Sequence, residues 1–237
     1  MNGSYLAHRV RLLAGPLIAF REYALRDVLP TFGNLDARAE QVADEYFNRI
    51  GSQPAGEYED VNMADVADAA QSQSYSWWEM MTSLRQTMLN LMTAGLFHLI
   101  EQQLATLSRD GVFDSPVRDT KISIVAAWYL EELNVSLESM PSWSAVNEMR
   151  LVANTVKHGE GSSARDLRAI NPTLFTNPAH AEFLRREGVD PSENVRHAVA
   201  APLSGDDFFV TEEALQGYAA GAEAFFLEIA EELLRLG

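Results

Sequence analysis

The chain has 237 residues, of which 47% are hydrophobic, and a formal net charge of −16 at pH 7. This length and apolar content suit one large domain or two small ones with a sizeable core. The charge disfavours non-specific binding to nucleic acid or to an anionic membrane. The absence of cysteine excludes disulfides and thiolate metal sites, and it predicts a cytoplasmic protein.

Apolar residues recur at helical spacing through most of the chain, which predicts an all-α protein. In chain order we expect helices over about 17–28, 35–50, 73–109, 122–138, 143–158 and 211–236. The segment 159–175 is expected to be a loop with short helical pieces, and 176–205 to be irregular. The helix over 73–109 should turn an apolar face to the core: Trp77, Met81, Leu84, Met88, Leu91 and Phe97.

These elements predict a helical bundle built on two long central antiparallel helices, near 73–109 and 143–158. Residues 1–70 are expected to form an N-terminal helical region that packs on a helical domain over 71–237. The apolar run 12–20 is followed at once by Arg21 and Glu22, so we interpret it as part of a helix and not as a signal peptide. No apolar run reaches the roughly 18 to 20 residues needed to span a bilayer, and no membrane partner is expected.

One helix carries an unusual polar row. Arg150, Asn154 and His158 recur every four residues, and residues at this spacing lie close together on a helix surface. Gly159 is expected to end the helix, with Lys157 and His158 in its last turn. One interpretation is a simple C-terminal cap, because cations and a following glycine suit that end of a helix. The other is a polar site on an otherwise packed helix.

The surroundings of this row differ in charge from the rest of the chain. Between positions 150 and 200 there are seven basic and six acidic residues, which leaves eleven basic and 28 acidic residues elsewhere. If a partner that carries phosphate, such as RNA or a nucleotide, binds to this chain, it is expected to bind here. The candidate contacts are Lys157, Arg165 and Arg168, and Glu101 on the preceding long helix is the acid that we expect to pair with the row.

The segment Asn154-Thr-Val-Lys-His158 resembles the N-x-x-x-H half of the signature of the HEPN superfamily. Its members are all-α, and many are ribonucleases of toxin–antitoxin and phage-defence systems. The resemblance extends loosely from about residue 73 to the end, and it implies that Asn154 and His158 belong to a site shared between two copies of the chain. In the family an arginine would stand at one of the positions 151–153, whereas here Arg150 lies one residue further away.

If the resemblance extends to activity, His158 would act as general acid or base on RNA and Arg150 would stabilise phosphate charge. Arg150 lies about 12 Å along the helix axis from His158, given a rise of 1.5 Å per residue. No Gly-rich phosphate loop and no metal-binding motif occurs, so neither a metal nor another cofactor is expected.

Three hypotheses therefore remain open. The first is a metal-independent endoribonuclease that uses His158, Asn154 and Arg150. The second is a non-catalytic helical module of the same type that binds a nucleotide or a protein, which the displaced arginine and the overall acidity favour. The third is an unrelated helical bundle in which the polar row is only a helix cap.

Overall fold

A computed structural model describes residues 3–52, 62–190, 198–203 and 205–236. All regular elements in these ranges are helical, which confirms the all-α class. The α-helices are α1 (Gly3–Leu13), α2 (Gly15–Tyr23), α3 (Leu35–Gly51), α4 (Met63–Ser108), α5 (Ile122–Leu133), α6 (Trp143–His158), α7 (Ser162–Ile170), α8 (Pro178–Arg186) and α9 (Glu212–Leu236).

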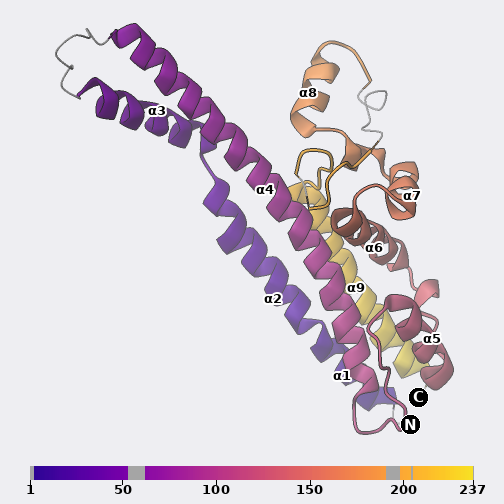
Figure 1. Ribbon diagram of the computed structural model, residues 1–237. Helices are drawn as coiled ribbons and strands as arrows, with labels where there is room; N and C mark the ends of the chain where they lie inside the picture. Colours follow the sequence, from indigo (N-terminus) through magenta and orange to yellow (C-terminus); the bar gives the residue numbers. More distant parts are fainter. Residues whose placement is uncertain (1–2, 53–61, 191–197, 204, 237) are drawn as a thin grey trace.

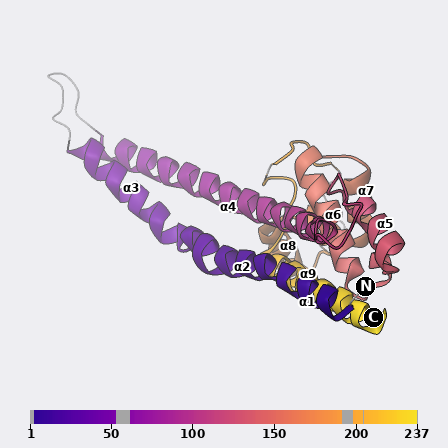
Figure 2. The same cartoon turned by 90° about the horizontal axis from the view of Figure 1, so that it is seen from below.

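Two N-terminal helices, α1 and α2, run one after the other along α9 (Figures 1 and 2). Pro16 stands in the first turn of α2, where its missing N–H costs nothing. The expected helix over 17–28 is in fact divided. Helix α2 ends at Tyr23, and a π-helical turn (Ala24–Val28) and a 3-10 turn (Leu29–Phe32) follow it. Buried residues of α1 and α2 belong to the main core: Leu6, Ala7, Val10 and Leu17.

Helix α4 spans 46 residues and is the axis of the molecule. It begins ten residues before the expected start, where the side chain of Asn62 accepts a hydrogen bond from the Ala64 N–H at 3.0 Å and caps the first turn. The helix runs without a break through position 70, the expected boundary between the two regions of the chain. That division stays a prediction, since α1 and α2 also contribute to the main core.

The prediction of which side of α4 is buried was largely wrong. The buried face contains Leu89, Leu96, Ile100 and Leu104. This stretch is apolar around most of its circumference, so spacing alone does not identify the covered side. Of the six expected core positions only Phe97 is buried, and the others are half-buried or exposed: Trp77, Met81, Leu84, Met88 and Leu91.

Helix α3 folds back along the first part of α4 (Figure 1). We call α3 together with residues 63–80 of α4 the arm. In both views the arm extends away from the other helices (Figures 1 and 2). Its buried apolar residues, Ala39, Val66 and Ala70, lie outside the main core cluster. The arm is therefore a two-helix hairpin with a narrow contact of its own.

The remaining helices pack against the second part of α4. Helix α6 contacts α4, α7 and α9 and has the expected bounds, but with 16 residues it is shorter than α9, which has 25. The segment 176–205, expected to be irregular, contains α8. Among the described residues, no helix is both long enough and apolar enough to cross a membrane.

Candidate functional site

Helix α6 has one face that solvent reaches. Its buried side chains point into the core: Val146, Met149, Leu151, Val152, Ala153, Thr155 and Val156. The others include a row that we call the polar stripe: Asn147, Arg150, Asn154, Lys157 and His158. At 100° per residue these five fall within about 100° of the helix circumference. The polar row predicted from the sequence therefore lies along the open face of α6.

The carboxyl end of α6 is closed by a distant segment. Gly159 has φ +69°, and a Cβ atom there would lie 2.9 Å from the carbonyl oxygen of Val199. The N–H of Leu203 donates to the carbonyl oxygen of Val156 at 2.8 Å, and the Glu160 N–H donates to the Val199 carbonyl at 2.9 Å. Glycine is required here both by its backbone angle and by the close approach. The end of the polar stripe is thus fixed in place.

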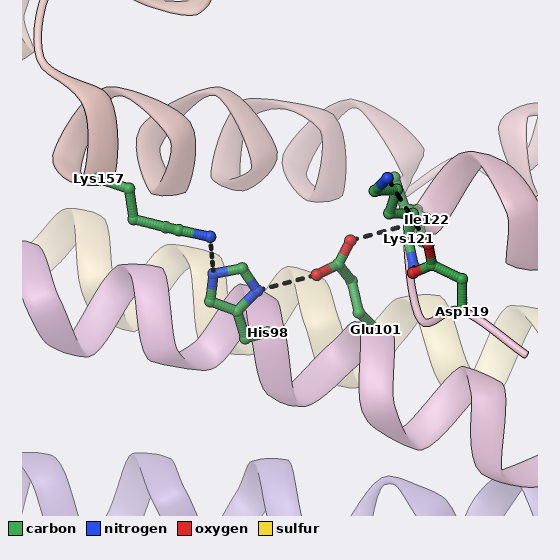
Figure 3. Close-up of polar contacts among 6 residues, drawn as sticks. All are labelled: His98, Glu101, Asp119, Lys121, Ile122 and Lys157. Atoms are coloured by element: carbon green, nitrogen blue, oxygen red, sulfur yellow. Dashed lines mark hydrogen bonds and ion pairs between the residues drawn. The ribbon is translucent and has the colours of Figure 1, made fainter.

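Three side chains join α4 to this end of α6 (Figure 3). A carboxylate oxygen of Glu101 lies 2.9 Å from Nδ1 of His98, and Nε2 of His98 lies 3.3 Å from Nζ of Lys157. A lysine ammonium has only donors, so Nε2 accepts from Lys157 and Nδ1 carries the N–H that donates to the Glu101 carboxylate. The contacts thus select the neutral tautomer with its lone pair on Nε2. We call these three residues the seam.

The carboxylate of the seam is well anchored. Glu101 is 9% exposed, and its other oxygen accepts the backbone N–H of Ile122 at 3.0 Å (Figure 3). That N–H belongs to the first turn of α5, where four amides lack partners within the helix and where a negative charge is favourable. Glu101 therefore caps α5 and orients His98 at the same time.

The other residues of the polar stripe have different surroundings. Arg150 donates from Nε and one terminal nitrogen to Oδ1 of Asn147, at 3.0 and 2.9 Å. His158 is exposed and makes no hydrogen bond or ion pair to any residue that the structure describes. Asn154 is half-buried. Glu101 itself bonds to His98 and to the Ile122 N–H and to none of Arg150, Asn154 and His158; it reaches α6 only through His98, which contacts Lys157.

The two arginines expected to contact phosphate lie on α7. Arg168 pairs with Glu160 at 2.8 Å and stacks over Phe175, with 4.3 Å between its guanidinium carbon and the ring centroid. The guanidinium holds the pKa of Glu160 below its ordinary value, and the Val199 N–H, which Glu160 accepts, acts in the same direction. Arg168 therefore stabilises the closure of α6, whereas Arg165 is exposed.

Two cavities among the described residues lie away from the polar stripe. One of about 490 Å³ is lined by residues between Asn171 and Ala214, and one of about 510 Å³ lies between α4 and the start of α9. Neither is lined by Asn154 or His158, so a cleft around these two stays a prediction. Within the described ranges no group of three or more histidine and acidic side chains could hold a metal ion.

His98 is the site residue that sequence reasoning did not select. A lone histidine on an apolar helix is usually a structural residue. The available signal was the spacing of three residues between His98 and Glu101, which places both on one side of a helix. Its contact with Lys157, 59 positions further along the chain, required the fold.

Comparisons of the chain with protein-family models, with curated proteins and with solved structures found no match.

Proposed function

We propose that the protein is a HEPN-like, metal-independent endoribonuclease whose site is formed by the seam and the polar stripe. The observation that carries this proposal is the position of His98, whose Nδ1 lies 2.9 Å from the carboxylate of the buried Glu101 and whose Nε2 lies 3.3 Å from Nζ of Lys157. A carboxylate that orients an imidazole in this way prepares it to act as a base. In this proposal α4 and α6 are the antiparallel central pair that brings the groups together.

The proposed reaction begins when an RNA phosphate binds Lys157. The ammonium moves from His98 to the phosphate, which frees the lone pair on Nε2. His98 then takes the proton of the ribose 2′-hydroxyl, and the 2′-oxygen attacks phosphorus. The bond to the 5′-oxygen breaks, and His158 donates a proton to that oxygen. The products are a 2′,3′-cyclic phosphate and a 5′-hydroxyl end.

The remaining groups of the site would position the substrate. Asn154 lies between Arg150 and His158 on the open face of α6, where its amide can donate to a phosphate oxygen. The proposal includes a homodimer in which two polar stripes meet, because a solvent-facing polar row in one chain leaves room for a second copy. Arg150, bonded to Asn147 within the chain, would turn to phosphate there. A role in a cytoplasmic toxin–antitoxin or phage-defence system belongs to the same proposal.

A cleavage assay with a fluorogenic RNA in the presence of a chelator tests the proposal. His98→Ala and His158→Ala should each lower the rate by roughly 10²- to 10⁴-fold, the usual contribution of one acid or base. Lys157→Ala should weaken binding and cleavage together. The matched control is His180→Ala, which removes an exposed histidine from α8 and should leave the rate unchanged. Full activity in the His158→Ala protein would show that the site is placed wrongly.

The second candidate is a binding module without chemistry. It is favoured by the bonding of Arg150 to Asn147 and by the apolar residues at positions 151–153, where the family has its arginine. In that case the purified protein is inert towards diverse RNAs. A labelled adenine nucleotide should still bind, and Lys157→Ala should reduce its affinity while His98→Ala has little effect. Calorimetry on the two variants separates the candidates.

A further inference from the structure

The arm lies at the other end of α4 from the seam and plays no part in the proposed reaction. It is acidic: α3 has four acids and two arginines, and α4 from Met63 to Met80 has three acids and no basic residue. A hairpin of only two helices cannot cover its own apolar side chains. Tyr75 and Met80 are each 58% exposed. Aromatic residues and methionine are enriched at protein–protein interfaces relative to the rest of the surface.

A shallow groove of about 310 Å³ runs between the two helices of the arm. Tyr75 and Trp78 stand on its α4 side with ring centroids 6.4 Å apart and planes 20° from parallel. Its α3 side carries Asp36 and Glu40. Asp36 accepts the indole N–H of Trp78 at 2.8 Å, which fixes the ring beside the carboxylate. Glu40 makes no hydrogen bond or ion pair with the described residues.

Two other aromatic rings of the arm already contact guanidinium groups of this chain. The guanidinium of Arg38 lies 5.7 Å from the ring centroid of Trp77, and that of Arg49 lies 5.2 Å from that of Tyr46. Both of the arm's arginines are thus placed over rings of the arm. The Tyr75–Trp78 pair faces the carboxylates of Asp36 and Glu40 across the groove, and the Tyr75 hydroxyl bonds to Glu79. Within the described residues no cation of this chain lies over the pair. Aromatic faces next to carboxylates are the environment that a guanidinium prefers.

We propose that this groove binds an arginine presented by a basic segment of another protein. The guanidinium would lie over Trp78 and Tyr75 and pair with Glu40 and the second oxygen of Asp36. The negative charge of the arm also restricts which partner can bind. A second arm is equally acidic and would be repelled, and RNA is repelled for the same reason. An open groove that follows two helices suits an extended or helical peptide better than a free amino acid.

Fluorescence anisotropy on the full chain tests this proposal. The probe is a fluorescein-labelled peptide with arginine at every third position, and the comparison probe has citrulline, the neutral isostere, in its place. The arginine peptide should bind at least tenfold more tightly. Tyr75→Leu and Glu40→Gln should each weaken its binding about fivefold or more, a change typical of one cation–π or charged contact.

Matched controls separate the groove from overall charge. Glu45→Gln removes one charge from the opposite face of α3, and Tyr46→Leu removes the ring that Arg49 already covers. Both should bind the arginine peptide as the parent protein does. Equal losses in Glu40→Gln and Glu45→Gln, or equal binding of both peptides, would overturn the proposal. Sedimentation that shows self-association lost in Tyr75→Leu would also overturn it and identify a second copy as the occupant.

Discussion

The two halves of α4 have very different surroundings although they belong to one uninterrupted helix. From Leu89 to Ser108, 13 of 20 residues are buried, whereas from Met63 to Met88 only three of 26 are. Both halves are rich in apolar side chains. The second half is enclosed by α1, α2, α6 and α9, while α3 covers the first half. Whether the apolar side chains of α4 are buried in the core therefore depends on how many other helices surround that part of α4. The seam likewise depends on the neighbouring helix α6.

The largest expected effect comes from replacing one leucine by alanine in each half of α4. Leu104 is fully buried in the second half, whereas Leu84 is 44% exposed in the first. Leu104→Ala should lower the free energy of unfolding by about 2–5 kcal/mol, because it removes buried contacts and leaves a cavity. Leu84→Ala should cost less than about 1 kcal/mol. Urea denaturation measures both, and equal losses would contradict the comparison.

A pair of acids on α4 gives the next largest effect. Glu101→Ala removes the acceptor of the Ile122 N–H and the partner of His98, and should cost about 1–3 kcal/mol. Glu79→Ala in the exposed half should change stability by no more than about 0.5 kcal/mol. Glu101→Gln retains an acceptor for Ile122 and should recover part of the loss. A Glu101→Ala protein as stable as the parent would show that Glu101 does not cap α5.

A smaller and local effect is expected within the arm. The hydroxyl of Ser74 donates to the carbonyl oxygen of Ala39 at 2.6 Å and joins α4 to α3. Ser74→Ala should cost about 1 kcal/mol. Hydrogen exchange should become roughly fivefold faster for amides of α3 and remain unchanged for α9, because the arm opens separately from the main core. Ser72→Ala, at an exposed position two residues earlier, serves as the control.

The smallest effect is expected at the closure of α6, where Glu160 pairs with Arg168. The pKa of Glu160 is lowered from 4.5, mainly by Arg168, so the bond stabilises the folded protein fully above that pH. Its contribution is lost as the pH falls through the lower folded pKa. Thermal unfolding should therefore show the parent more stable than Glu160→Gln at pH 7, with the gap closing as the pH falls through the lowered pKa of Glu160. A gap that stays the same down to the acid limit of folding would argue against the ion pair.

Several features of the site were predicted from local patterns. Helix α6 begins at Trp143 and ends at His158 as expected, because its apolar spacing and the following Gly159 act within a few residues. The open polar stripe also agrees with the predicted row. The buried side of α4 could not be predicted from local spacing, because apolar side chains surround this helix. Only the neighbouring helices decide which of these side chains are covered.

The sequence by itself determined that the protein is all-α, where α6 ends and which polar side chains share its surface. These properties depend on interactions three or four residues apart. Only the tertiary structure decided that His98 lies between Glu101 and Lys157, and that Val199 and Leu203 close α6. Apart from the bond between His98 and Glu101, these contacts join segments dozens of residues apart. They form because burial of the core brings the helices together. No local sequence pattern specifies which distant segments come into contact.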